Sequence, residues 1–191
     1  MKSVLISINP KWCDLIASGK KTVEVRKTRP KMETPFKVYI YCTKGRGDCL
    51  WRWNGIWYDT QFPNERPNRL DGKVIGEFVC DFIRREEEVA DGLVDIVLER
   101  TSCVDARELV KYANGNTLYS WHISDLVIYD KPRELSEFCL PCDHKNDCGT
   151  CKRAKYCIDP INSEYRFHNC ELENGLKRPP QSWCYVKGGE E

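Results

Sequence analysis

The sequence has no long hydrophobic run and almost no excess of charge of either sign. No apolar stretch approaches the ~20 residues that a membrane-spanning helix needs, which excludes a helical membrane protein. The opening MKSVLISINP lacks the longer apolar region and the small-residue cleavage site of a signal peptide, so we interpret it as a first strand. Internal repeats and low-complexity tracts are also missing. We therefore expect a soluble, cytoplasmic protein that does not contact a membrane.

The net charge of +1 conceals two regions of opposite sign. Residues 1–37 contain nine basic and three acidic residues, a net charge of +6. Residues 77–100 contain eight acidic and three basic residues, a net charge of −5. A locally basic face can bind phosphates even when the whole protein is nearly neutral. Two solvated faces of opposite charge would produce the same pattern.

Hydrophobic patterning predicts a single mixed α+β domain over residues 1–191. Short strand-like segments lack the regular βαβ alternation of a parallel fold, and they suit a small barrel of five to six strands. We predict strands at residues 3–8, 22–26, 36–44, 73–85, near the end of 117–130, and at 183–187.

Two or more helices are expected to flank this barrel. Pro10 stands at a favourable first helical position, and Gly19 is suited to end that helix. A second helix is predicted over residues 102–115, whereas residues 93–100 fit a strand or a helix. The segment WRWNGIWY is predicted to form a hairpin.

The segment GKKTVEVR, residues 19–26, places four charges beside strand-forming residues. Pleating separates its polar and apolar side chains, with Thr22, Glu24 and Arg26 on one face and Val23 and Val25 on the other. The turn at Gly19 lets Lys21 leave this alternation and join the polar face. The residues alone favour a solvated strand face, with a Glu–Arg pair that contributes about 0–1 kcal/mol, and a ligand site is the alternative.

Six of the twelve cysteines lie between residues 139 and 170. Two C-x-x-C pairs occur there, and the turn Cys148-Gly149-Thr150-Cys151 would aim two thiolates at one zinc ion. The surrounding segment has few aliphatic residues and could hardly fold without a metal staple. We predict a structural zinc site in a Cys-rich loop, residues 139–176, inserted before the final strand. Disulfides and an iron–sulfur cluster are the alternatives.

The pattern Gly19-x-Lys21-x-x-Glu24-x-Arg26 resembles the signature of the ASCH domain, a small β-barrel similar to the PUA domains that bind RNA. The resemblance covers residues 1–44 and 117–138 well, includes 178–186 as the closing strand, and is weak over 45–116. The later segments resemble a subgroup found in phage or prophage-type sequences. The fold expected from this resemblance is a PUA-like barrel with a zinc-stapled loop.

The resemblance implies a protein that binds RNA or a nucleotide in a cleft lined by Lys21, Glu24 and Arg26. The two cations would donate to phosphates or base edges, and Glu24 would accept from an exocyclic amine or orient the cations. No obligate protein partner is evident. The remaining predicted binding residues are Gly19, Thr22, Trp12, Trp121 and His122, the two tryptophans as base-stacking platforms. A core position for Trp12 and a structural role for His122 are the alternatives.

Some small ASCH proteins are similar to amidohydrolases that act on acetylcytidine through a Lys, a Thr and a distant Glu. Lys21 matches that Lys, but Glu24 stands where the Thr is expected, so the nucleophilic hydroxyl is missing. Hydrolysis of a modified nucleoside, or of RNA with His122 as base, is therefore the alternative function. Lys21 and Glu24 are its catalytic candidates.

The resemblance to relatives with a Cys-rich tail also selects the metal ligands. It implies a zinc ion held by Cys142, Cys148, Cys151 and Cys170, with Cys139 and Cys157 in reserve. Four thiolates would close the coordination shell, which is typical of a structural zinc site.

Overall fold

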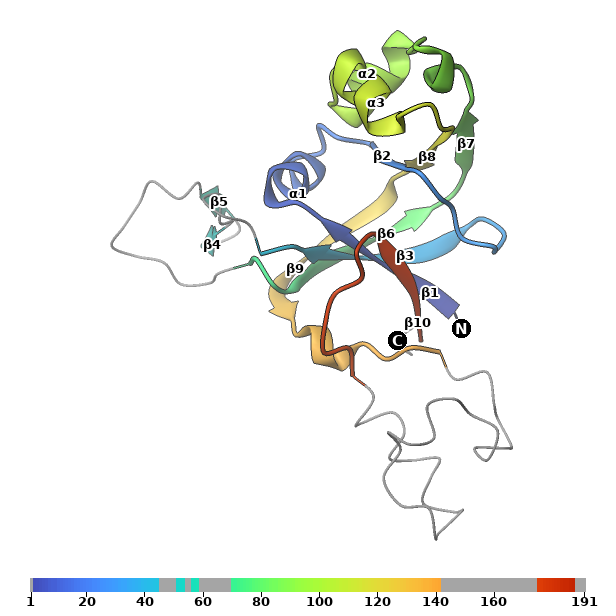
Figure 1. Cartoon of the computed structure of the whole chain (residues 1–191). Helices are drawn as coiled ribbons and strands as arrows, with labels where there is room; N and C mark the ends of the chain where they lie inside the picture. The colour runs from blue at the N-terminus through green and yellow to red at the C-terminus, as the bar shows by residue number, and fades with distance from the viewer. Residues whose placement is uncertain (1, 45–50, 54–55, 59–69, 142–174, 188–191) are drawn as a thin grey trace, which may run out of the picture.

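The computed structural model of the chain describes residues 2–44, 51–53, 56–58, 70–141 and 175–187. These residues form ten strands, three α-helices and two short 3-10 helices, η1 (Glu88–Asp91) and η2 (Leu135–Glu137) (Figure 1). The predicted mixed α+β class is confirmed. No helix among the described ranges is long and apolar enough to cross a membrane.

A five-stranded sheet forms the centre of the fold, with the strand order β10-β1-β3-β6-β9. β1 and β3 run parallel, and the other neighbours are antiparallel. The strands are β1 (Lys2–Ile8), β3 (Phe36–Cys42), β6 (Val74–Cys80), β9 (Ser124–Arg133) and β10 (Trp183–Lys187). The prediction of a closing strand at 183–187 is therefore confirmed, and this strand pairs with the first one.

A second sheet has the order β2-β8-β7, and a separate hairpin pairs two further strands. The three-stranded sheet contains β2 (Val23–Arg26), β7 (Ile83–Glu86) and β8 (Leu118–His122). The hairpin contains β4 (Trp51–Trp53) and β5 (Ile56–Tyr58), at the place predicted for it. The predicted turn of this hairpin lies outside the described residues.

The predicted closed barrel is wrong. The expected long strand over 73–85 is divided into β6 and β7, and the chain passes from the larger sheet to the smaller one between them. The same change occurs between β8 and β9. Because both segments leave one sheet to enter another, the described strands form open sheets instead of one continuous ring.

The first helix begins and ends where the sequence predicts. Asn9 accepts a hydrogen bond from the Lys11 amide at the start of α1 (Pro10–Ala17), and Gly19 follows its end with φ +72°. This dihedral lies in the left-handed region that glycine adopts without steric cost. The C-terminal turn therefore directs the chain towards β2.

The second predicted helix starts later than expected. The chain forms α2 (Ile96–Ser102) and then α3 (Ala106–Ala113), because Cys103 adopts a left-handed conformation with φ 55° and ends the first of them. Asp105 then caps α3 by accepting from the Arg107 amide. Residues 93–100, for which strand and helix were both open, contribute the start of α2.

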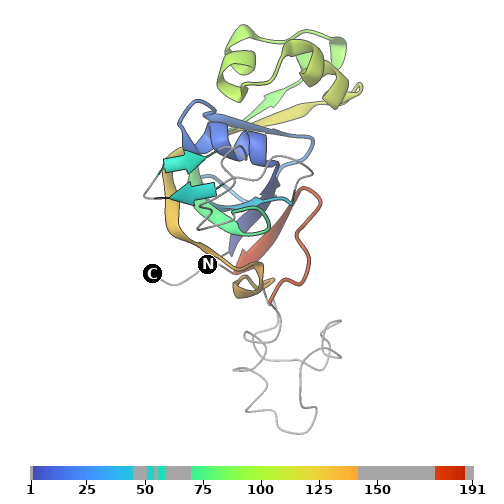
Figure 2. The ribbon, with the colours of Figure 1, turned by 90° about the vertical axis from the view of Figure 1, so that its left-hand side faces the viewer.

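Three hydrophobic clusters pack around the two sheets. One lies between the five-stranded sheet and α1, and a second covers the opposite face of that sheet beneath η2. A third lies between the three-stranded sheet and the helices α2 and α3, which cap the molecule in Figure 2. Val23 and Val25 belong to this third cluster, so the core-facing side of the GKKTVEVR strand is confirmed.

Candidate functional site: a buried charge network

The structure brings the three charged side chains of the signature together. Lys21 precedes β2, and its backbone amide donates to the Leu15 carbonyl at the end of α1. Lys21 Nζ lies 3.3 Å from Glu24 Oε2, and Arg26 Nη2 lies 2.8 Å from Glu24 Oε1. The turn at Gly19 thus aligns Lys21 with two side chains that share one face of the strand. We call Lys21, Glu24 and Arg26 the buried charge network.

Burial is the feature of this network that sequence reasoning missed. Lys21 is 2% exposed and Glu24 is 6% exposed, and the Arg26 side chain is 12% exposed. The solvated Glu–Arg pair that the residues alone favoured is therefore wrong, whereas the role of these three side chains in lining a ligand cleft stays a prediction. Only the outer part of Arg26 reaches solvent to any extent.

Hydrogen bonds from the network connect three separate parts of the chain. Lys21 Nζ donates to the Ser102 carbonyl at 2.7 Å, and Arg26 Nη2 donates to the Ser7 carbonyl at 2.6 Å. The network therefore ties β2 to the end of α2 and to β1. Neither serine was singled out for this role, because the contact uses backbone oxygens, which leave no trace in the side-chain pattern.

Two buried nitrogen donors near the network have no partner among the described residues: Arg26 Nε and Trp121 Nε1. Leaving a buried donor unpaired costs about 1–3 kcal/mol. Glu24 and Trp121 are direct partners across β2 and β8, so their side chains project from the same face. Both donors therefore favour an additional acceptor, which water or a bound molecule can supply.

The two predicted stacking tryptophans have different environments. Trp121 is 0% exposed and packs edge-on against Phe36 and Trp183, so its predicted role as a stacking platform is wrong. A fully buried ring has no free face for a base. Trp12 is partly exposed, and the ammonium groups of Lys11 and Lys21 lie 4.5 Å and 5.3 Å from its ring centroid. Trp12 therefore lies where the network meets the surface.

His122 is not gathered into the network. It pairs with Val23 across the two strands, which places its side chain on the opposite face from that of Glu24. Its Nδ1 lies 2.7 Å from Asp81 Oδ1, and its ring stacks on Phe82 with centroids 4.6 Å apart. The side-chain pairing differs from the backbone-bonded histidine that we expected as the alternative. Asp81 and Phe82 were missed because they lie in the unpredicted break between β6 and β7.

The two catalytic candidates are both engaged in ion pairs. Each oxygen of the Glu24 carboxylate contacts a cation, and the Lys21 ammonium is bonded on two sides. A carboxylate held in this way is a poor nucleophile. This geometry gives the hydrolytic alternative no free attacking group at position 24.

Nearby thiols are suited to packing instead of chemistry. Burial above all, then the neighbouring Cys42 and the charge of Glu24, raises the pKa of the Cys13 thiol well above its usual range. Burial, together with the charge of Asp81, raises the pKa of Cys80 to about 12. Both thiols therefore stay protonated at neutral pH and behave as small apolar groups.

The other predicted binding residues, Gly19 and Thr22, flank the network through the backbone. The Thr22 amide donates to the Thr101 carbonyl, and the Thr22 carbonyl accepts from the Ile123 amide. Gly19 is exposed at the turn. Both positions therefore shape the approach to Lys21, whereas the Thr22 hydroxyl forms no hydrogen bond within the described part of the chain.

The predicted zinc ligands Cys142, Cys148, Cys151 and Cys170, and the reserve Cys157, lie outside the described residues. Cys139 is described: its carbonyl accepts from the Lys187 amide, and it forms an isolated bridge with Gly175. Within the described ranges, no group of three or more potential metal ligands occurs.

Part of the chain is similar to a known domain family. Residues 6–98 match the model of the ASCH domain family, the family that the sequence resemblance named. The phage or prophage-type subgroup stays a prediction. No curated protein matches the chain.

Among solved structures, the chain is similar to the crystal structure of ASCH from Zymomonas mobilis. The two share 20% identity over 70% of this chain and 73% of that one, with a TM-score of 0.48. A tyrosine-to-phenylalanine variant of the same protein matches at 19% identity, with 71% and 77% coverage and a TM-score of 0.48. A serine-to-alanine variant matches at 20% identity, with 70% and 74% coverage and a TM-score of 0.46.

Proposed function

We propose that this ASCH domain protein binds RNA or a nucleotide at the surface that overlies the buried charge network. The observation that carries the proposal is the position of Trp12. Its ring is partly exposed, and its centroid lies 4.5 Å from the ammonium of the exposed Lys11 and 5.3 Å from that of the buried Lys21. An aromatic ring bordered by cations offers stacking to a base and charge to a phosphate.

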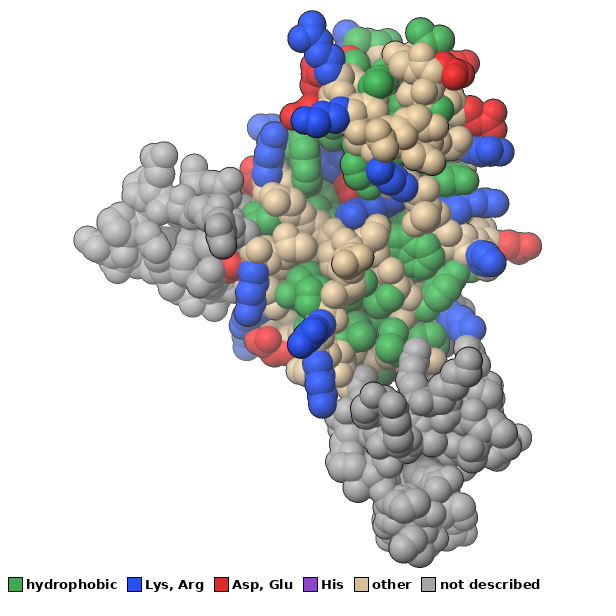
Figure 3. Space-filling model, in the orientation of Figure 1, with side chains coloured by type: hydrophobic (Ala, Val, Ile, Leu, Met, Phe, Trp, Pro, Cys, Tyr) green, Lys and Arg blue, Asp and Glu red, His purple; other side chains and the backbone are tan. Residues whose placement is uncertain are grey.

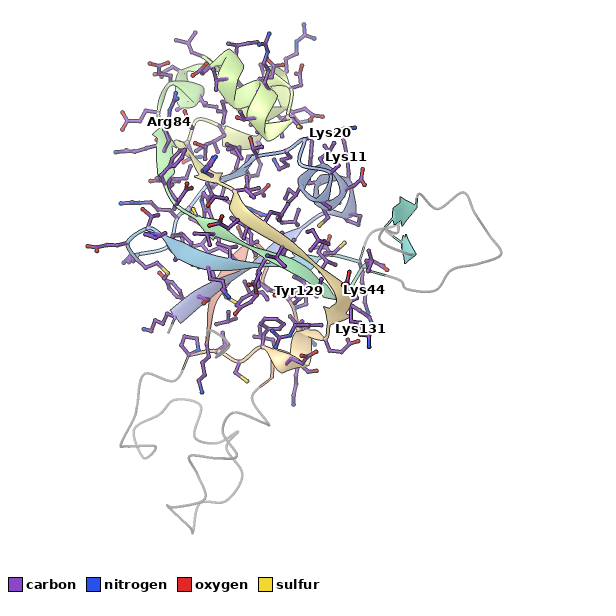
Figure 4. The ribbon with its side chains drawn as sticks, turned by 180° about the vertical axis from the view of Figure 1, so that it is seen from behind. Lys11, Lys20, Lys44, Arg84, Tyr129 and Lys131 are labelled. Atoms are coloured by element: carbon purple, nitrogen blue, oxygen red, sulfur yellow. The ribbon has the colours of Figure 1, made fainter. Side chains whose placement is uncertain are left out.

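The basic side chains around this ring support the proposal. Lys11 lies in the first turn of α1 and Lys20 follows the end of the same helix, and both are exposed (Figure 4). Lys and Arg side chains follow the left flank of the molecule downwards from this level (Figure 3). We call Trp12, Lys11 and Lys20 the Trp12 surface. Stacking of one base on an exposed aromatic ring contributes about 1–3 kcal/mol.

The network has a supporting role in this proposal. Glu24 holds both cations, and Lys21 in turn packs beneath the Trp12 ring. Arg26 uses Nη2 for Glu24 and for the Ser7 carbonyl, while its Nε has no described partner. A base-edge or phosphate oxygen that reaches this nitrogen would satisfy it.

Fluorescence anisotropy with labelled single-stranded RNA tests the proposal. The double variant Lys11→Gln/Lys20→Gln should bind more weakly, and its dependence of log Kd on log salt should be shallower by about 2, because each lysine that contacts a phosphate contributes about 1. The matched control, Arg107→Gln/Lys111→Gln on α3, removes the same charge from exposed positions elsewhere. Equal salt slopes in the two variants would contradict the Trp12 surface.

Turnover separates binding from the hydrolytic alternative. The binding proposal predicts that acetylcytidine incubated with the protein releases no more acetate than it does alone. Rapid acetate release that Lys21→Met abolishes in a protein that remains folded would instead favour an amidohydrolase.

The proposal includes one structural zinc ion in the loop 139–176, held by Cys142, Cys148, Cys151 and Cys170. Its support is the closely spaced thiols and the shortage of aliphatic residues in this segment. Elemental analysis of protein purified without added metal should find one zinc per chain, and Cys148→Ser should lose it. The control Cys103→Ser, outside the cluster, should keep it. Negligible zinc with every thiol titratable in the folded protein would contradict this part.

A further inference from the structure

A pocket of about 430 Å³ lies on the face of the five-stranded sheet that is opposite to α1. Its walls come from the end of β3, the turn before β6, the segment around η2, and residues 176–179 before β10. Small-molecule sites typically occupy about 300–1,000 Å³. The pocket is therefore large enough for an organic ligand, and it lies apart from the buried charge network.

Two exposed lysines give this pocket positive charge. Lys44 and Lys177 are both exposed and both line it. The one carboxylate in the lining, Glu134, pairs with Lys73 at 2.8 Å. No carboxylate of the described residues forms an ion pair with Lys44 or Lys177. Their charges are therefore free to attract an anion.

The backbone holds Lys44 in place across a glycine turn. Gly72 has φ +82°, and a Cβ at this position would lie 2.5 Å from Lys44 Cε. The missing side chain therefore lets the lysine lie close against the turn. The Gly72 amide donates to the Cys42 carbonyl at 2.7 Å, and the Thr43 amide donates to the Ile8 carbonyl at 2.8 Å.

The opposite wall is held just as closely. The backbone of Ser136 approaches Gly175 so nearly that any side chain at Gly175 would collide with the Ser136 carbonyl oxygen. The Leu176 amide donates to the Phe138 carbonyl at 2.9 Å. These contacts hold together the segments that contribute Ser136 and Lys177 to the lining, which also includes Thr43 and Lys44.

The chemistry of the lining selects the anion. Lysine ammonium groups act as point charges and combine with hydroxyls around a tetrahedral phosphate, whereas planar carboxylates are best matched by the fork of arginine. Thr43 and Ser136, which carry hydroxyls, line the pocket together with the two lysines. Leu135 and Leu176 add apolar wall, and the volume greatly exceeds that of one phosphate group.

We propose that this pocket binds a phosphate-bearing organic molecule, with the phosphate between Lys44 and Lys177 and the organic part against Leu135 and Leu176. The phosphate can belong to a free phosphomonoester or to a nucleic-acid strand. Tyr41 at the floor stays a hydrogen-bond donor, because burial first, and then the nearby Cys42, Asp71 and Glu134, raises the pKa of its phenol.

Calorimetric titration of the full chain with adenosine monophosphate, with adenosine, and with a short RNA tests the proposal. Adenosine monophosphate or the RNA should bind, and adenosine should not compete. Lys44→Gln and Lys177→Gln should each weaken binding about tenfold, as expected for a charged hydrogen bond of roughly 1.5 kcal/mol. The matched control is Lys131→Gln, an exposed lysine beside Lys44 in Figure 4 that does not line the pocket.

The outcomes separate the source of the phosphate and separate this site from the Trp12 surface. Binding of adenosine monophosphate that depends on Lys44 and Lys177 supports a free phosphomonoester, and binding of RNA alone with the same dependence supports a strand. Either result should persist in Lys11→Gln/Lys20→Gln. Lys44→Gln and Lys177→Gln indistinguishable from Lys131→Gln with every probe would overturn the proposal.

Discussion

The molecule contains two charged regions that lie on opposite sides of the five-stranded sheet and are built in opposite ways. In the buried charge network, Lys21 and Arg26 lie 3.3 Å and 2.8 Å from the Glu24 carboxylate, and all three side chains are almost completely covered. In the pocket, Lys44 and Lys177 are exposed, and no described carboxylate pairs with them. The difference shows that charges close together in sequence can form buried ion pairs that connect parts of the fold. Isolated lysines, in contrast, can remain exposed and accessible to a ligand.

The energetic consequences of the two arrangements also differ. A buried ion pair stabilises little compared with an apolar replacement, but removing one partner leaves an uncompensated charge away from water. An exposed pair contributes about 0–1 kcal/mol, whichever partner is removed. Single substitutions in the two regions should therefore have very different effects on the free energy of unfolding.

Glu24→Gln is expected to have the largest effect. It keeps the shape of the side chain but leaves Lys21 and Arg26 buried without a counter-charge, so the free energy of unfolding should fall by about 3–5 kcal/mol. Urea denaturation measures the loss. The matched control is Glu134→Gln at the pocket, where the carboxylate is 59% exposed and pairs with Lys73, and the loss should stay within about 1 kcal/mol. Similar small losses in both variants would mean that the network is effectively solvated.

The burial of the network also decides whether a substitution of Arg26 can be used to probe ligand binding. If Arg26 formed only a solvated pair with Glu24, Arg26→Ala could weaken binding while changing the free energy of unfolding by at most about 1 kcal/mol. Because Arg26 is bonded to Glu24 and to the Ser7 carbonyl, that substitution should also destabilise the fold. Binding measurements are therefore better made with the exposed lysines of the Trp12 surface.

A smaller, pH-dependent effect is expected at Glu77, on the pocket side of the five-stranded sheet. Burial works to raise the pKa of this carboxyl, but hydrogen bonds from Tyr129 and Lys37 and the Lys37 charge outweigh it and lower the pKa from 4.5. A carboxylate with a depressed pKa stabilises the fold above the pKa of the unfolded chain, and this contribution disappears as the pH falls through the folded value. The Lys37 ammonium lies 2.9 Å from Glu77 Oε1.

Thermal unfolding of Glu77→Gln beside the wild-type protein measures this contribution. At about pH 7 the variant should be less stable, by no more than about 1 kcal/mol because the pair is partly solvated, and the gap should close as the pH approaches about 3. A gap that stays constant with pH would show that Glu77 stabilises the sheet through packing and not through its charge.

Several elements could be predicted from the sequence because their signals are local. Asn9 and Pro10 mark the start of the first helix, and Gly19 marks its end. The alternation of side chains along β2 places Val23 and Val25 in the core. The same local logic failed for the helix expected at 102–115. Cys103 adopts a left-handed conformation there, which is uncommon for a residue other than glycine and asparagine and is not signalled by the pattern.

The candidate site was predictable in its membership but not in its environment. The sequence by itself determined that Lys21, Glu24 and Arg26 would converge, since a glycine turn and strand pleating act over a handful of residues. Only the tertiary structure decided that they would be buried, because their covering partners are distant: Ser102 lies 81 residues from Lys21, and Ser7 lies 19 residues from Arg26. Trp121, which the sequence predicted at the surface, is buried for the same reason, because it packs against Phe36 and Trp183 from distant strands. The open sheets likewise depend on where β6 and β8 leave one sheet for the other, and that is a property of long-range pairing which no local window contains.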